Sequence, residues 1–380
     1  MQKKIFFFKV AAVFLPFVIL FLLEISAQLF YFFQHNRTFL YQTRAHDKTG
    51  FLQMDELGLL WFKKNSTVRL KHYSTYTADL YTDNFGLIHN GSEFREPPDP
   101  LNFNIIFLGG STVEGRGSTS NKNTIPALLE SCLREKNKKI NIYNFGFSGD
   151  NTFNENLRIH SKSEYFKPDL VIALDGRNDF DTFYTKKSLL NNSHVLTSNL
   201  TYIYNNLSKL EFSLGLLNEY MTENIVLYKY FYMKLKNKKE DETKRFYHNL
   251  SKEHKLVYLA YHQSSASWLK LRYDGIKYAV FFQPTLAYKK KKTNEEIIHI
   301  ENFNKKINDF GDYNKNLYNF YDLFLEKEKN LNYDLFNLSD IFEYHNHTAY
   351  VDSVHYNDAG NLYIAKKMCN IIKKNYLRIY

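Results

Sequence analysis

Residues 104–112 read Asn-Ile-Ile-Phe-Leu-Gly-Gly-Ser-Thr, a short apolar run that ends in two glycines and a serine. The run predicts a buried β-strand, and the glycines predict a sharp turn at its end. A serine placed there can present its hydroxyl at the edge of a sheet, with backbone N–H groups near a reacting carbonyl. Ser111 is therefore a candidate nucleophile, although Gly-Gly-Ser-Thr alone is more typical of a phosphate loop or a plain turn.

The pattern of strand, turn and helix recurs downstream. Apolar strands are predicted at residues 139–143, 170–174 and 278–282, and an amphipathic helix at residues 124–136. Strands that alternate with helices indicate a parallel α/β sheet, and functional residues gather at the carboxyl ends of such strands.

The chain of 380 residues divides by composition into three parts. We predict an N-terminal segment at 1–35, a β-rich lead-in region at 36–100 and the main domain at 101–380. Turn signals between short alternating runs in 51–100 predict small strands there. Residues 181–276 are helix-prone and carry no catalytic motif, so we expect an insertion that caps the site.

The N-terminal segment contains a long apolar stretch at residues 5–23, which is sufficient to span a bilayer as a single helix. Lys3 and Lys4 precede it and Glu24 follows it, so the positive-inside rule places the N-terminus in the cytoplasm and the rest in the periplasm or outside the cell. A cleaved signal peptide is the alternative, because Ser26-Ala27 fits a cleavage site.

The formal net charge of +10 favours an anionic contact such as a phospholipid surface, an acidic glycan or nucleic acid. The basic residues are dispersed and no zinc-finger or RNA-binding motif accompanies them, so we predict no nucleic-acid partner. The densest lysine clusters, residues 236–239 and 289–292, are expected in exposed loops. The two cysteines, Cys132 and Cys369, lie in apolar helical patterns and are expected to be buried free thiols.

Near the C-terminus, Val351-Asp352-Ser353-Val354-His355 places an aspartate three residues before a histidine. This spacing lets the carboxylate bind one ring nitrogen while the other faces a serine, so the imidazole can act as a general base. His347 also stands at His-x4-Asp spacing from Asp352, a pattern that we interpret as coincidental.

Two further motifs follow predicted strands. Residues 144–149 end in Gly149, and Gly176-Arg-Asn-Asp contains Asn178. They offer a backbone amide and a side-chain amide, the groups that can stabilise an oxyanion. Asp179 and Asp181 lie beside them, but no other ligand cluster accompanies these two carboxylates, so we predict no metal and no cofactor.

In this order, the motifs resemble the four blocks of the SGNH (GDSL-like) hydrolases, with matches at Ser111, Gly149, Asn178, and Asp352 with His355. The resemblance covers residues 103–185 and 277–375, and the N-terminal anchor with its β region is similar to a membrane-attached bacterial subgroup. Gly110 and Thr112 depart from the family, which often has Asp and Leu there.

The resemblance implies a flavodoxin-like three-layer sandwich with a parallel sheet, preceded by a transmembrane helix and a small β region. It implies a catalytic triad of Ser111, Asp352 and His355 and an oxyanion hole formed by Ser111, Gly149 and Asn178. The activity implied is that of a serine esterase that removes acyl groups, often acetyl, from cell-surface carbohydrate or lipid. The expected partners are this acylated substrate and the membrane. An O-acyltransferase with the same triad, or a catalytically silent polysaccharide-binding or assembly protein, are the alternatives.

Overall fold

The computed structural model describes residues 2–35, 51–54, 60–71, 77–91, 97–134, 139–184, 221, 225, 228, 251–306, 317–318, 320–322 and 331–377. They belong to two compact units, Met1–Leu52 with Thr197–Tyr247, and Gln53–Leu196 with His248–Tyr380. The second unit carries all the residues of the predicted site.

In the first unit, α1 (Gln2–His35) is a helix of 34 residues that contains the stretch predicted to span a membrane. Among the residues that the structure describes, no helix is long and apolar enough to cross a bilayer, so the predicted anchor is not confirmed.

The second unit begins with short strands. Strand β1 (Leu52–Met54) spans the boundary between the two units, which lies between Leu52 and Gln53. It forms a small two-stranded sheet with β2 (Leu60–Phe62). Next, β3 (Thr67–Lys71) and β4 (Thr77–Tyr81) pair antiparallel. These strands lie in the stretch where short strands were expected.

The main part of the second unit alternates strands and helices. In chain order the elements are β5 (Phe103–Gly109), α3 (Ser111–Glu114), the 3-10 helix η1 (Asn121–Asn123), α4 (Ile125–Arg134), β6 (Ile140–Gly146), α5 (Thr152–Phe166), β7 (Leu170–Asp175), α6 (Arg177–Tyr184), α10 (Ser251–Arg272), β8 (Lys277–Phe282), the 3-10 helix η4 (Leu286–Tyr288), α11 (Asn294–Lys306), β9 (Asp334–Asn337) and α13 (Asp358–Asn375).

Five of these strands form one parallel sheet in the order β6-β5-β7-β8-β9. This is the strand order of flavodoxin-like sheets, with the first strand, β5, between the second and the third. The four strands predicted from apolar runs are β5 to β8. The fifth, β9, has the short sequence Asp-Leu-Phe-Asn and lies at the edge of the sheet, so it carries little of the apolar signal that marks a buried strand.

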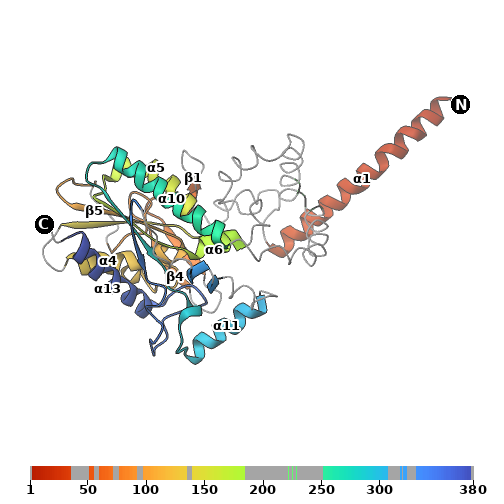
Figure 1. Ribbon diagram of the computed structural model, residues 1–380. Helices are drawn as coiled ribbons and strands as arrows, with labels where there is room; N and C mark the ends of the chain where they lie inside the picture. The colour runs from red at the N-terminus through yellow and green to blue at the C-terminus, as the bar shows by residue number, and fades with distance from the viewer. Residues whose placement is uncertain are drawn as a thin grey trace. The chain divides into compact units, whose positions relative to one another are not determined.

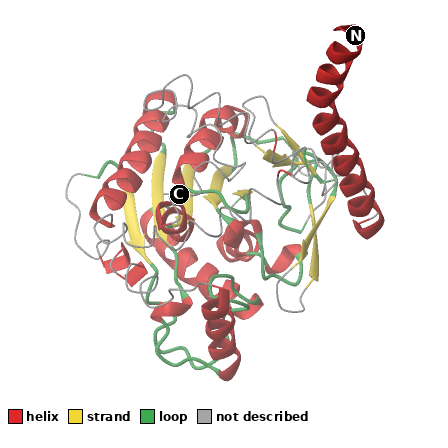
Figure 2. Ribbon diagram, turned by 90° about the vertical axis from the view of Figure 1, so that its right-hand side faces the viewer, coloured by secondary structure: helices red, strands yellow, loops and turns green. Residues whose placement is uncertain are grey.

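Helices cover both faces of the sheet, as Figures 1 and 2 show. Alternate residues of β5 point to opposite sides. Ile105 and Phe107 belong to one apolar core with residues of α4 and α13, whereas Ile106 and Leu108 belong to the other core with residues of α5 and α10. The predicted three-layer α/β sandwich is confirmed by this arrangement.

Helix α10 lies inside the interval 181–276 that was expected to be a cap over the site. Its residues Tyr258 and Leu269 are buried in the core on the α5 side. This helix, which lies between β7 and β8 in the chain, therefore belongs to one of the helical layers of the sandwich. Except for residues 221, 225 and 228, the interval 185–250 lies outside the described residues.

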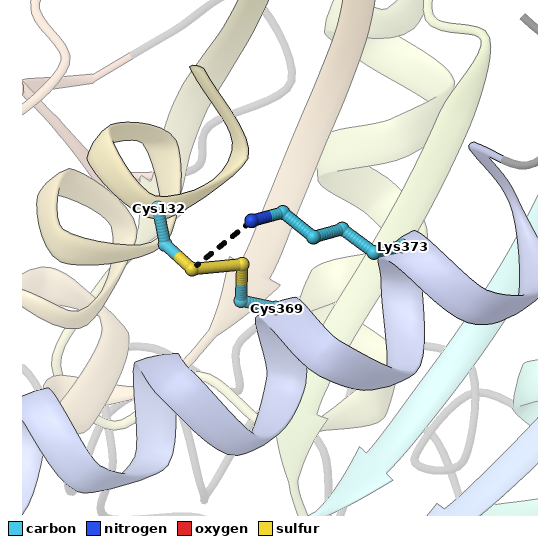
Figure 3. Close-up of a disulfide and its surroundings, with 3 residues drawn as sticks. All are labelled: Cys132, Cys369 and Lys373. Atoms are coloured by element: carbon cyan, nitrogen blue, oxygen red, sulfur yellow. Dashed lines mark hydrogen bonds between the residues drawn. A yellow bond between two sulfur atoms is a disulfide. The ribbon is translucent and has the colours of Figure 1, made fainter. Parts of the chain in front are cut away.

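The expectation of free thiols was wrong, because Cys132 and Cys369 form a disulfide between α4 and α13 (Figure 3). The two Cα atoms are 6.3 Å apart, although 237 residues separate the cysteines in sequence. The helices pack side by side on the same face of the sheet, which brings the two thiols within bonding distance.

We expect the double variant Cys132→Ser, Cys369→Ser to lose stability, because the disulfide closes a long loop and restricts the unfolded chain. The loss should be on the order of 2–5 kcal/mol in unfolding free energy. Denaturant unfolding of the oxidised protein, the reduced protein and the double variant measures it. Equal midpoints for oxidised protein and variant would contradict the expectation.

Candidate active site

The predicted site residues come from the carboxyl ends of neighbouring strands. Ser111 begins α3 just after β5, Gly149 follows β6, and Asn178 lies in the first turn of α6 after β7. In this strand order the chain leaves β5 and β7 towards opposite faces of the sheet, which creates the crevice where such folds bind ligands. Asp352 and His355 reach it from the loop before α13.

Two hydrogen bonds connect Ser111, His355 and Asp352. The Ser111 Oγ lies 2.7 Å from Nε2 of His355, and Nδ1 of His355 lies 2.7 Å from Oδ2 of Asp352. Nδ1–H donates to the carboxylate, so Nε2 is left to accept the serine hydroxyl proton. The side chains of His355 and Asp352 are only 13% and 24% exposed, which limits screening by water. This is the geometry of a serine activated by a general base.

The carboxylate of Asp352 is held by its own loop. Its Oδ1 accepts the backbone N–H groups of Val354 and His355, both at 2.7 Å. Oδ2 is thereby aimed at the imidazole. Tyr350 and Tyr356 form an antiparallel bridge that closes the loop at its base. His347, the other candidate partner of Asp352, has an exposed side chain, and the imidazole beside Asp352 is that of His355.

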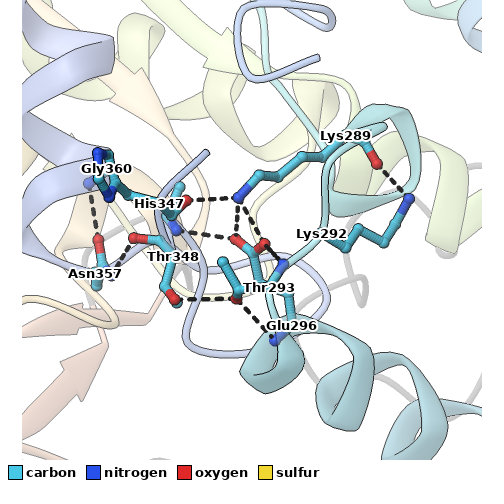
Figure 4. A network of polar contacts seen from close by, with 9 residues as sticks. Lys289, Lys292, Thr293, Glu296, His347, Thr348, Asn357 and Gly360 are labelled. Atoms are coloured by element: carbon cyan, nitrogen blue, oxygen red, sulfur yellow. Dashed lines mark hydrogen bonds and ion pairs between the residues drawn. The ribbon is translucent and has the colours of Figure 1, made fainter. Parts of the chain in front are cut away.

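A buried ion pair fixes the segment just before this loop (Figure 4). Lys289 and Glu296 are both 0% exposed, and Lys289 Nζ lies 2.6 Å from Oε2 of Glu296. The ammonium also donates to the carbonyl of His347 at 2.6 Å, and the backbone N–H of Ala349 donates to Oε1 of Glu296 at 2.9 Å. Ala349 in turn accepts the N–H of Asn357 through its carbonyl at 2.9 Å. The pair therefore holds both ends of the Asp352–His355 loop, and we call it the Lys289–Glu296 clamp.

The clamp corrects the expectation of an exposed loop at residues 289–292 for Lys289, whereas Lys290 and Lys291 are exposed as expected and Lys292 is half-buried. Burial alone would raise the pKa of Glu296, but hydrogen bonds from Ala349 and Lys289 hold that pKa below its usual value. The carboxylate is thus ionised opposite the Lys289 ammonium. A lysine run looks the same in sequence whether it faces water or a carboxylate seven residues on, so composition carried no sign of this contact. The other cluster, residues 236–239, lies outside the described residues.

On the other side of Ser111, the side chain of Asn178 is oriented by the turn that carries Gly149. Asn178 Nδ2 donates to the carbonyl of Asp150 at 2.7 Å. The turn is closed by the Asp150 N–H to the carbonyl of Phe147 at 3.0 Å, and Gly149 has a φ of +85°, which favours glycine at this place in a turn. The turn that carries Gly149 and the side chain of Asn178 are therefore in direct contact.

The departure of Gly110 from the family pattern has a structural cause. A Cβ atom at position 110 would lie 2.1 Å from Nδ2 of Asn178 and 3.3 Å from the carbonyl oxygen of Asp150. Any larger residue would push the Asn178 amide out of its place. In this chain a side chain at position 110 fits only if the Asn178 amide moves.

Buried carboxyl groups join the loop after β6 to the loop after β7. Asp179 Oδ1 accepts the backbone N–H and the hydroxyl of Thr152, at 3.0 and 2.5 Å. Burial, then repulsion from Asp175, raises the pKa of Asp179 to about 7. Burial and the neighbouring Asp175 raise the pKa of Glu155 well above its usual value, which favours its protonated form. Within the described part of the chain, no group of three or more acidic, histidine or cysteine side chains could hold a metal ion.

Asp181, predicted as a possible companion of Asp179, points elsewhere. Its Oδ2 lies 3.1 Å from Nε of Arg177, one turn earlier in α6. Arg177 and Glu296 were not among the predicted site residues, and Lys289 was expected only as part of an exposed lysine cluster. The Arg177–Asp181 pair has the i,i+4 spacing of a helix, whereas the buried Lys289–Glu296 pair is fixed by how the chain packs.

The parallel sheet and the serine, histidine and aspartate at its carboxyl edge define the class of SGNH-type serine hydrolases. The chain belongs to the family described as GDSL-like lipase/acylhydrolase, whose model matches residues 105–368. A search of curated proteins finds no match.

Among solved structures, the chain is similar to an acetyl xylan esterase named AlAXEase, with 16% sequence identity and a TM-score of 0.37, over 71% of this chain and 99% of that one. It is also similar to Axe2, an acetylxylan esterase from Geobacillus stearothermophilus, with 14% identity and a TM-score of 0.36, over 72% of this chain and 96% of that one.

We expect Gly110→Ala to lower kcat by about 10²- to 10³-fold, the usual effect of losing one oxyanion donor, because the new methyl group displaces the Asn178 amide. Asn178→Ala should cause a similar loss. Since both changes remove the same contact, the double variant should lose little more than either single variant. Steady-state kinetics of the three variants tests this. Wild-type turnover by Gly110→Ala, or losses that multiply in the double variant, would contradict it.

The clamp predicts separate effects on stability and on turnover. Glu296→Gln leaves the Lys289 charge buried without its partner, so unfolding free energy should fall by about 3–5 kcal/mol. In the double variant Lys289→Met, Glu296→Leu, much of the lost unfolding free energy should be recovered. Its kcat should nevertheless be lower than that of the wild type, because the Ala349 N–H has lost its acceptor, Glu296.

The matched control for the clamp is Glu343→Gln. Its partner Lys290 follows Lys289 in sequence, but this ion pair is exposed, with side chains that are 62% and 28% accessible. Removing an exposed pair should cost less than about 1 kcal/mol. Equal unfolding midpoints for Glu296→Gln and Glu343→Gln, or full turnover in the apolar double variant, would refute the role of the clamp.

Proposed function

We propose that the protein is an esterase that removes acyl groups, acetyl foremost, from cell-surface carbohydrate or lipid through an acyl-enzyme on Ser111. The observation that carries the proposal is the pair of 2.7 Å hydrogen bonds from Ser111 to His355 and from His355 to Asp352. The family supports acyl ester chemistry in general. The acetyl group agrees with the printed names of the similar xylan esterases, and the carbohydrate or lipid follows from the resemblance of the motifs.

In the proposed mechanism, Ser111 Oγ attacks the ester carbonyl carbon while Nε2 of His355 takes the hydroxyl proton. Asp352 stabilises the imidazolium that forms. The Ser111 N–H, as the first residue of α3, has no acceptor within its helix and can donate to the oxyanion together with the Gly149 N–H and the Asn178 amide. His355 then gives its proton to the leaving alcohol, and water, activated by the same imidazole, hydrolyses the acyl-enzyme.

We also propose that the catalytic unit works outside the cytoplasm, in the periplasm or at the cell exterior, with the N-terminus anchored in the membrane. The basic residues before the apolar stretch at 5–23 favour this orientation. The Cys132–Cys369 disulfide supports the same compartment, because such bonds persist in oxidising surroundings.

An O-acyltransferase would use the same acyl-enzyme with a sugar hydroxyl in place of water. A catalytically silent binding protein would need no hydrogen-bonded serine, and the short contact between Ser111 and His355 argues for the enzyme.

The test is turnover of p-nitrophenyl acetate by the full-length protein, with free acetate and acetyl transfer to added oligosaccharides both quantified. We expect acetate release that falls at least about 10³-fold in Ser111→Ala and in His355→Gln. Ser161→Ala is the matched control, since its hydroxyl only donates to the carbonyl of Arg158 in α5. Transfer in place of release would select the acyltransferase. Equal rates in all variants would exclude catalysis by Ser111.

A further inference from the structure

A cavity of about 160 Å³ lies beside the proposed catalytic residues. Ser353, between Asp352 and His355, forms part of its lining, and so does Arg177, which directly precedes Asn178. Thr285 and Leu286 line it from the loop after β8. These residues all follow carboxyl ends of strands or belong to the histidine loop, so the cavity lies on the same edge of the sheet as Ser111.

Both ionisable side chains that line the cavity are basic. Its lining contains Arg177 and Lys292, and no acidic side chain lines it among the residues that the structure describes. Arg177 is only 3% exposed, and its Nε contacts Asp181. Burial lowers the pKa of Lys292, the nearby Glu296 carboxylate opposes this shift, and Lys289 adds to it. The Lys292 ammonium also donates to the carbonyl of Lys289, and an anion in the cavity would stabilise its charged form further.

The remaining walls are mostly apolar. They come from the loop after β8, from α11 and from the segment around Leu317, and include Leu286, Ile300, Phe303, Leu317 and Tyr318. The ring of Phe303 lies 5.8 Å from Cζ of Arg177, a distance at which the ring face favours a cation. Two cations among aliphatic and aromatic walls suit a group that joins a negative charge to a compact carbon skeleton.

We propose that this cavity is a subsite for a carboxylate carried by the ester substrate, so that the enzyme acts by preference on acyl esters of acidic carbohydrates. A guanidinium binds a carboxylate through paired hydrogen bonds, the Lys292 ammonium adds a point charge, and the apolar walls contact the sugar ring. This inference rests on the proposed esterase function, because it assigns the cavity to part of an ester whose carbonyl lies at Ser111. It adds the substrate class to that function.

The wild-type enzyme provides the first test. Two substrates are compared, the 3-O-acetyl esters of methyl galactoside and of methyl galacturonoside, which differ only in the carboxylate at C6. We expect kcat/KM to be at least about tenfold higher for the acidic ester, the effect of one added charge-assisted hydrogen bond.

Two variants then test whether the cavity residues cause the preference for the acidic ester. Lys292→Gln and, independently, Arg177→Gln should bring the ratio of the two kcat/KM values close to one. The ratio is the readout because a general loss of activity affects both substrates and cancels. Lys290→Gln is the matched control, since Lys290 is exposed, pairs with Glu343 and does not line the cavity, so its ratio should equal that of the wild type.

Binding measurements on an inactive variant distinguish the subsite proposal from the esterase proposal. In Ser111→Ala, an NMR titration should show methyl galacturonoside binding at least about tenfold more tightly than methyl galactoside, and Lys292→Gln should abolish the difference. If p-nitrophenyl acetate is not hydrolysed but this binding difference is seen, the esterase proposal fails while the anionic subsite stands. Equal binding of the two sugars, or a preference that survives both Lys292→Gln and Arg177→Gln, would overturn the subsite.

Discussion

The site depends on the hydrogen bond between His355 Nδ1 and Asp352 Oδ2. This bond selects the ring tautomer, turns Nε2 towards Ser111 and supplies the negative charge that an imidazolium requires. Both residues lie in one loop before α13, so the bond survives only if that loop keeps one conformation. The Lys289–Glu296 clamp, the Tyr350–Tyr356 bridge and the backbone N–H bonds to Asp352 all restrict it.

The parallel sheet positions the nucleophile and the proposed oxyanion donors. Because β5, β6 and β7 are parallel neighbours, the turns that follow them converge at one edge and bring Ser111, Gly149 and Asn178 together from distant parts of the sequence. Asp179 and Thr152 connect the second and third of these turns, and Asn178 connects with Asp150 across the same gap. The proposed oxyanion donors are thus held by polar contacts that are themselves shielded from water.

The sequence allowed four of the five sheet strands and the positions of the site motifs to be predicted, because apolar runs bounded by glycine and short motifs at strand ends are local signals. The contacts that were missed are not local. The Cys132–Cys369 disulfide, the burial of Lys289 against Glu296 and the approach of Gly110 to Asn178 arise only when the elements pack. β9 was missed for a different reason, since four partly exposed residues carry too little periodicity.

The central claim is that His355 makes Ser111 nucleophilic. It is tested most directly by treating the folded protein with a fluorophosphonate and locating the adduct by peptide mass spectrometry. The account predicts one adduct, on the peptide that contains Ser111, and no adduct on this peptide in the His355→Gln variant over the same time. A folded wild-type protein that takes up no label, or takes it up on another residue, would contradict the account.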